Sequence, residues 1–365
     1  MKIRKLKIGL LSCLLAMGLM AGCSDQTYLD EASATETFQE ASTETSSETE
    51  TSSAEEITEV ASSSSEEEHT EFDPYYETTQ PTYYPYVDPD GYPAPENWRE
   101  LYPHGSAGKL EGTIAVISIF AEDAYGGWDE TEQQNRATYA RAYYDLRLAC
   151  EYISAESAKY DKEVIFEWDW MKHPELCYEA SFTDDNLANV LYDYGVIDEA
   201  VWKFIETYVD SEGIRKQYDA SSVVYMLYVN SPSDANGPSC TRNFYYGMPY
   251  PYEICYIQMN QSNRETPPAV FAHEMLHTFG APDLYWTDLY QNYRLEYGIT
   301  KKYAQQIAKE GLNDLMRITW DAKTGKYLYH SISPEITDIT AYYVGLIDHS
   351  DTVEKWGFDK SQHDQ

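Results

Sequence analysis

Apolar runs in the middle of the chain predict four β-strands. Residues 111–123 are β-branched and continuously apolar, which is typical of a buried strand. Residues 163–170 alternate between apolar and polar positions, and residues 221–230 and 252–260 are again apolar. A stretch rich in Pro, Gly, Ser and Asn at 231–251 separates the last two runs and predicts a loop.

Helical spacing of apolar positions dominates elsewhere. It predicts helices at 131–158, 184–209, 300–310 and 338–347, the second broken near Gly195. One further helix is predicted to begin at Thr266 as N-cap, with Pro267 at the first helical position, and to run through His277 to Gly280. Strands and one long helix come first and helices follow, which predicts an α+β fold. We expect a twisted mixed sheet, the helix that ends at Gly280 beneath it, and a helical C-terminal part.

The first 23 residues have the pattern of an export signal. Basic residues in the first seven positions precede an apolar run at 8–21, which is short for a membrane span. Met20-Ala21-Gly22-Cys23 then resembles the lipobox of bacterial lipoproteins. That resemblance implies a lipidated Cys23 as the first mature residue and an extracytoplasmic protein on the bacterial cell surface.

Composition divides the rest of the chain in two. Residues 24–100 are a Ser/Thr/Glu tract that becomes Tyr/Pro-rich, and they hold 21 acidic residues against Arg99 alone. Such a segment buries too little apolar surface to fold, so it predicts a disordered tether. Residues 101–365 show no repeat or second linker and are expected to form one domain. The net charge of -36 argues against nucleic acid as a partner.

Four cysteines follow Cys23, an even number in a chain predicted to be exported. This pattern predicts two disulfides, although buried thiols are the alternative in a domain of this size. We expect Cys240 to pair with Cys255 and Cys150 with Cys177, because these bridges close short loops. Zinc binding by cysteine is not expected, because the chain has no Cys-x-x-Cys pair.

The stretch "AHEMLHTFGAPDLY" at 272–285 carries the candidate chemistry. His273 and His277 are four residues apart, so on a helix both imidazoles can face one zinc ion. Glu274 lies beside the first ligand and can act as the general base for a metal-activated water. Gly280 suits the end of the helix, and Asp283 can then return as a third ligand. Apolar neighbours on all sides of this helix favour a buried site over a solvated surface.

These residues carry a family resemblance. "HEMLHTFGAPD" resembles the His-Glu-x-x-His-x-x-Gly-x-x-His/Asp signature of metzincin zinc proteases, in the aspartate form of snapalysin-like enzymes. "FGAPDLY" is also similar to the matching stretch of immune inhibitor A-type secreted proteases. The resemblance implies a metzincin-like fold with a methionine turn under the metal, and it gives Met316 that role. Metzincins with a tyrosine ligand carry it two residues later, where this chain has Ile318.

Two assignments stay open at this point. Thermolysin-like enzymes take a glutamate from a later helix as third ligand, and Glu296 lies near that spacing. We prefer Asp283, because glycine and aspartate match the signature together. The group that stabilises the oxyanion is also open, with Tyr285 and Tyr290 as candidates.

The sequence thus predicts a lipid-anchored zinc endopeptidase that acts on proteins or peptides. The strand at 252–260 is the expected edge along which an extended substrate lies, and a monomer is expected. One zinc ion is the expected cofactor, and bound calcium is left open. The alternatives are a zinc hydrolase of a cell-wall or acyl amide, and a surface binding protein on an inactive protease scaffold. The presence of Glu274 argues against the binding protein, which has no use for a general base.

Overall fold

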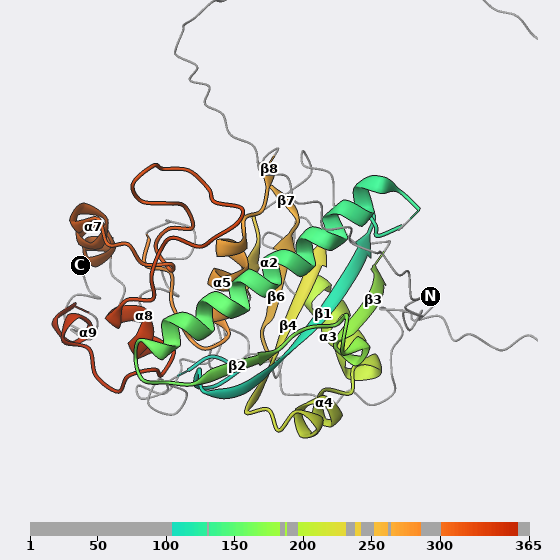
Figure 1. Cartoon of the computed structure of the whole chain (residues 1–365), viewed down its shortest axis with the longest axis horizontal. Helices are drawn as coiled ribbons and strands as arrows, with labels where there is room; N and C mark the ends of the chain where they lie inside the picture. The colour runs from blue at the N-terminus through green and yellow to red at the C-terminus, as the bar shows by residue number, and fades with distance from the viewer. Residues whose placement is uncertain are drawn as a thin grey trace, which may run out of the picture. The chain divides into compact units, whose positions relative to one another are not determined.

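The structure of this chain, a computed structural model, describes its central and C-terminal parts. The described residues are 104–129, 131–182, 187, 196–230, 238–241, 252–261, 264–285 and 301–356, and they all belong to one compact unit. Figure 1 draws them in colour along the chain. The predicted signal, Cys23 and the tether at 24–100 lie outside these residues.

A mixed sheet of six strands forms the centre of the fold. Its order is β2-β1-β4-β6-β5, and β3 also pairs with β1. Every pairing is parallel except that between β5 and β6. The strands are β1 (Gly112–Asp123), β2 (Val164–Glu167), β3 (Cys177–Phe182), β4 (Ser222–Val229), β5 (Cys240–Thr241) and β6 (Ile254–Gln258). Strands β1, β4 and β6 are buried over most of their length, as their continuous apolar runs predict.

Strand β1 is long enough to hold two partners on one side. Its first half pairs with β2, from Gly112 opposite Val164, and its second half with β3, from Ser118 opposite Cys177. The run predicted as one strand at 163–170 therefore ends at Glu167, and a turn containing the buried Trp170 follows. The sequence pattern predicted neither β3 nor the two-residue β5, which lies inside the predicted loop.

Two helices position the candidate site. The long helix α2 (Gln133–Ala158) crosses one face of the sheet in Figure 1 and packs against α5 (Pro268–His277). Pro267 is the N-cap of α5, not Thr266 as predicted. The Thr266 hydroxyl instead donates to the carbonyl of Gln258, because the β7–β8 hairpin turns the chain back at this point.

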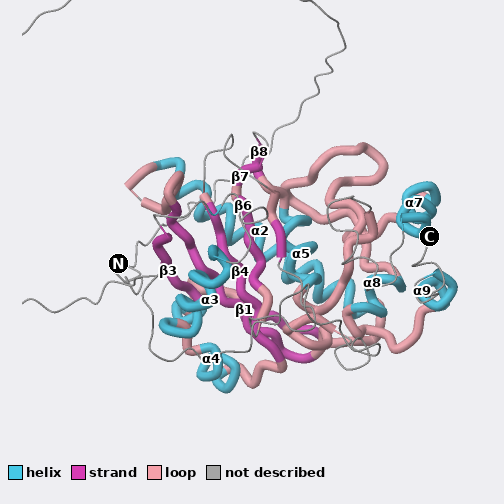
Figure 2. Tube along the Cα trace, turned by 180° about the vertical axis from the view of Figure 1, so that it is seen from behind, coloured by secondary structure: helices cyan, strands magenta, loops and turns pink. Residues whose placement is uncertain are grey.

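The remaining short elements complete the unit. Figure 2 shows α7, α8 and α9 gathered at one end of the fold, away from β3 and α4. This agrees with the expectation of a helical C-terminal part, although α9 and α4 were not predicted. These elements are η1 (Pro174–Leu176), α3 (Val196–Tyr208), α4 (Ser211–Gln217), β7 (Asn260–Gln261), β8 (Arg264–Glu265), α7 (Lys301–Glu310), α8 (Asp338–Tyr343) and α9 (Asp351–Trp356).

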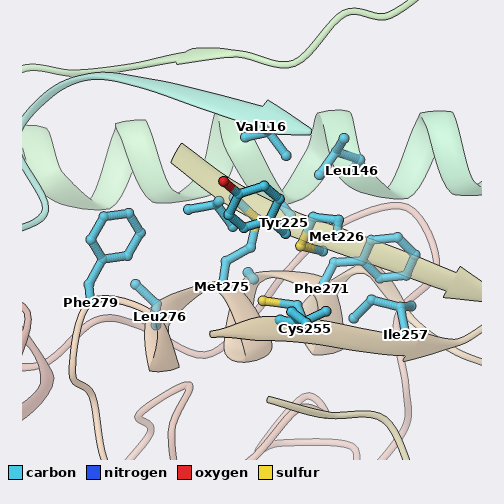
Figure 3. Close-up of a cluster of buried hydrophobic side chains, with 14 of the residues drawn as sticks. Val116, Leu146, Tyr225, Met226, Cys255, Ile257, Phe271, Met275, Leu276 and Phe279 are labelled. Carbon is cyan, nitrogen blue, oxygen red and sulfur yellow. The ribbon is translucent and has the colours of Figure 1, made fainter. Parts of the chain in front are cut away.

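One apolar cluster joins α5 to the sheet. Figure 3 shows Phe271 and Met275 of α5 together with Met226 of β4 and Cys255 of β6, and all four side chains are fully buried. Helix α5 is apolar nearly all round, and all of its residues except the half-buried Val270 are buried. Its three polar side chains are therefore held away from bulk water.

The fold is thus a mixed α/β arrangement with a mixed sheet and several helices, consistent with the predicted α+β class. Among the described residues, no helix combines the length and the apolar character that a membrane crossing requires.

Candidate metal centre

Three side chains of the motif converge in the interior. Asp283 Oδ1 lies 3.2 Å from His273 Nε2 and 3.5 Å from His277 Nε2. One ligand atom from each residue can be chosen so that all three lie within 4.8 Å of one another. Two imidazole nitrogens and one carboxylate oxygen are a donor set that zinc uses at catalytic sites. The preferred third ligand therefore stands beside the two histidines, whereas Glu296 lies outside the described residues.

Backbone carbonyls fix how both histidines present their nitrogens. The Leu315 carbonyl accepts from His273 Nδ1 at 3.0 Å, and the Ala281 carbonyl accepts from His277 Nδ1 at 2.7 Å. A carbonyl can only accept, so Nδ1 keeps its proton and the lone pair of each neutral imidazole is on Nε2. Partners of this kind orient metal-binding histidines in proteins. Both Nε2 atoms thus face Asp283.

The short distances between these side chains shift the pKa values of His273 and Asp283. Burial lowers the pKa of His273, but the hydrogen bond to Asp283 and the charges of Glu274 and Asp283 outweigh it and raise the pKa to about 9. Burial raises the pKa of Asp283, yet its contacts with both histidines hold it well below the usual range. Without a metal, His273 and Asp283 therefore form an ion pair at neutral pH. A metal ion would replace the Nε2 proton of that pair.

A tight turn returns Asp283 to the histidines. Gly280 N donates to the His277 carbonyl at 2.8 Å and Ala281 N to the Leu276 carbonyl at 3.1 Å, the bonding pattern of a Schellman motif. Gly280 has a φ of +97°, and a Cβ there would meet the backbone N of Gly105 at 2.8 Å. Both the conformation and the close approach require glycine at the predicted turn, although α5 itself ends at His277, three residues before the predicted end.

Glu274 lies beside the candidate ligands, and its side chain has a hydrogen-bond partner of its own. It is 5% exposed, and burial raises the pKa of its carboxyl group. The Thr241 hydroxyl of β5 lies 2.9 Å from its Oε2 and 2.9 Å from its backbone carbonyl oxygen. The sequence pattern did not predict a role for Thr241, which lies 33 residues away in a stretch predicted as a loop.

Met316 lies in a turn next to the site. Its carbonyl accepts from Leu284 N at 2.9 Å, and the preceding residue, Leu315, supplies the partner of His273. The Asp314 carboxylate accepts from Met316 N at 2.7 Å and from the hydroxyls of Thr337 and Thr340. Asp314 was not predicted, although it stands two residues before the methionine that was.

Of the two tyrosines considered for the oxyanion, only Tyr285 belongs to the described part of the chain. Its ring stacks on that of His273 with centroids 6.4 Å apart and planes 20° apart. The side chain is 40% exposed, so it can meet a ligand that enters from solvent.

The structure does not bear out the two predicted disulfides, because all four cysteines are thiols. Cys240 stands opposite Tyr256 and Cys255 opposite Thr241. Alternate residues of a strand point to opposite faces, so the two thiols point away from each other. Cys177 lies against Tyr139, which precedes Cys150 by three turns of α2 and about 16 Å of helix. Short loops made both pairings look favourable but carried no information on side-chain direction.

The predicted substrate edge also needs correction. Strand β6, within the predicted strand at 252–260, lies between β4 and the short antiparallel β5. Among the described strands, β5 is therefore the outermost on this side of the sheet. The loop predicted at 231–251 contains this edge.

Comparisons with known proteins add no assignment to this geometry. No protein-family model matches the chain, and no curated protein matches its sequence.

Proposed function

We propose that this chain is a zinc endopeptidase of metzincin-like fold, held on the outside of a bacterial cell by a lipid on Cys23. One observation carries the proposal: His273, His277 and Asp283 bring three ligand atoms together in the interior, with the carboxyl group of Glu274 on the same helix. The mixed sheet above α5 and the methionine turn at Met316 are further support.

The donor set fits zinc, and three protein ligands leave a coordination position open, as catalytic zinc sites do. When bound, zinc would supply Lewis acidity at a substrate carbonyl and make a nearby water more acidic.

The protein's own residues supply the remaining steps. Leu315 and Ala281 hold the two imidazoles through their carbonyls. Glu274 takes a proton from the attacking water and passes it to the nitrogen of the breaking amide bond, which can then leave as an amine. Burial raises the pKa of Glu274, and a carboxyl group with a raised pKa can serve as base and then as acid. Tyr285, exposed beside His273, is our choice for stabilising the oxyanion.

Substrate profiling tests the proposed reaction. The purified full-length chain, loaded with zinc, is incubated with a peptide library, a denatured protein and cell-wall peptidoglycan, with and without a chelator. We expect chelator-sensitive cleavage of internal peptide bonds in the first two substrates. Release of cell-wall amides alone would place the chain among hydrolases of non-protein amides, and no cleavage of any substrate would contradict an enzymatic role.

A further inference from the structure

The partner of Glu274 comes from an unexpected element, the two-residue strand β5. Thr241 is 7% exposed and stands opposite Cys255 of β6. Directly opposed residues of an antiparallel pair share one face of the sheet, so both side chains reach α5. The Thr241 hydroxyl and the Cys255 thiol both contact the carbonyl oxygen of Glu274, at 2.9 and 3.3 Å.

Only Thr241 of these two also reaches the carboxyl group. Its hydroxyl oxygen lies 2.9 Å from Oε2 of Glu274 as well as 2.9 Å from the carbonyl oxygen of the same residue. The two oxygens of Glu274 share the single hydroxyl proton in a three-centre hydrogen bond, which ties the carboxyl group to the backbone of its own helix. A carboxyl group restrained in this way has one oxygen engaged and keeps the other for a proton transfer.

We propose that Thr241 is a positioning residue that holds the Glu274 carboxyl group in its working orientation, a role that rests on the hydrolytic function proposed above. A buried carboxyl group without such a partner would turn towards other polar atoms or water. Because β5 is the outermost described strand on its side, Thr241 also joins Glu274 to the edge of the sheet. An extended peptide that adds to this edge would lie next to the residue that orients the base.

Four variants of the full-length, zinc-loaded chain separate this role from simple packing. Thr241→Val keeps the shape of the side chain but removes the hydroxyl, whereas Thr241→Ser restores it. Cys255→Ala is the matched control, because it removes the thiol that contacts the Glu274 carbonyl and the Thr241 hydroxyl but keeps the hydroxyl beside the carboxyl group. Glu274→Gln supplies the reference for a double variant.

Thr241→Val is expected to lower kcat roughly 10-fold or more, the effect of losing a hydrogen bond to a charged group, with KM and zinc content unchanged. Thr241→Ser and Cys255→Ala should keep kcat within about threefold of wild type. Adding Thr241→Val to Glu274→Gln should cause almost no further loss, because both changes act through one group. An unchanged kcat in Thr241→Val, or an equal loss in Cys255→Ala, would overturn the proposal while the hydrolytic function stands.

Crystal structures of metal-free wild type and Thr241→Val provide a readout independent of activity. We expect the Glu274 carboxyl group to leave its wild-type position in the variant, and the same position in both would overturn the role of Thr241. If Thr241→Val does not fold, Thr241→Ala is examined in its place with the same readouts. Absence of cleavage by wild type would instead reject the hydrolytic function, whatever the two structures show.

Discussion

At the scale of single residues, burial of charge shapes both the site and its surroundings. Asp145 of α2 is 2% exposed, and its Oδ2 has no hydrogen-bond partner among the described residues. Burial raises the pKa of Asp145 to about 7, against the opposing charge of Arg141 and with a small further rise from Glu265. Asp145 therefore carries a proton in the folded chain at pH values where the unfolded chain has released it.

This difference predicts a dependence of stability on pH. The contribution of Asp145 to the free energy of unfolding should be largest below about pH 4. This contribution should fall by up to about 4 kcal/mol as the pH rises to about 7. Asp145→Asn cannot ionise, so it should be more stable than wild type at pH 8 and similar to it at about pH 4. Urea unfolding at both pH values measures this, with the exposed Glu151→Gln on the same helix as control. Equal stabilities of wild type and Asp145→Asn at pH 8 would contradict the assignment.

A second prediction for single residues concerns which carboxylate is the third ligand of the proposed zinc site. Asp283 Oδ1 lies between the two Nε2 atoms, so Asp283→Ala should lose most of the bound zinc. Glu296→Ala, in the stretch outside the described residues, should keep one zinc per chain. Metal analysis of both proteins after dialysis at neutral pH decides between them. Loss of zinc from Glu296→Ala with retention in Asp283→Ala would assign the ligand to the glutamate.

At the scale of elements, two turns lie next to α5, one at Gly280 and one at Met316. They determine where the side chains of the candidate metal centre lie. Gly280 directs the chain back towards the histidines, and a side chain there would strike the backbone of residues 104 and 105. Gly311 offers a matched comparison: its φ is +70°, and no described atom lies within 4 Å of an added Cβ. Replacing both glycines by alanine therefore separates the cost of a left-handed conformation from that of a clash.

Gly311→Ala should cost about 1 kcal/mol of unfolding free energy, because only the conformation is unfavourable. Gly280→Ala should cost about 2 kcal/mol more, because the backbone of the neighbouring segment must move. It should also weaken zinc binding, since Asp283 follows the turn by three residues. Urea unfolding and zinc titration of both variants provide the measurements. Equal losses of stability together with wild-type zinc affinity would show that the turn does not control the site.

The turn that contains Met316 depends on the buried side chain of Asp314. Its carboxylate is fully buried and accepts hydrogen bonds from Met316, Thr337 and Thr340. Asp314→Ala should lower the free energy of unfolding by about 3 kcal/mol, because several buried donors lose their acceptor. Asp321 accepts a similar set of bonds from Thr324 and Ser333 in an open surface turn. Asp321→Ala should therefore have a much smaller effect in thermal unfolding, and similar losses in both variants would contradict this account.

At the scale of the whole molecule, features that depend on the local spacing of residues were predicted from the sequence. Features that depend on pairing between distant segments were not. His273, Glu274, His277 and Asp283 lie within eleven residues, so the geometry of one helix and one turn was enough to predict that they meet. Strands β1, β4 and β6 were predicted because burial on both faces makes their sequences continuously apolar. The spacing of residues thus predicted both the cluster of side chains and the strands of the sheet that covers it.

The features that the sequence did not predict depend on contacts between distant segments of the chain. Thr241 is a site residue only because a two-residue strand pairs with β6, and two residues are too few to produce a period. The partner of His273 is a backbone carbonyl, which any residue at position 315 would supply. The Cys240–Cys255 pairing failed for a related reason, because strand register decides which way a cysteine points. The Cys150–Cys177 pairing failed because Cys177 meets α2 at Tyr139, three turns before Cys150.

The proposed function requires Glu274 to act as a base beside a bound metal, and a comparison of wild type with Glu274→Gln tests this role. Zinc content and peptide turnover are measured on the same preparations of wild type and Glu274→Gln. Glutamine keeps the shape of the side chain but not its basicity, so the variant should hold one zinc per chain and bind peptide normally. Its turnover should fall by at least the ~100-fold that a general base contributes. A zinc-loaded Glu274→Gln that cleaves as fast as wild type would contradict the account.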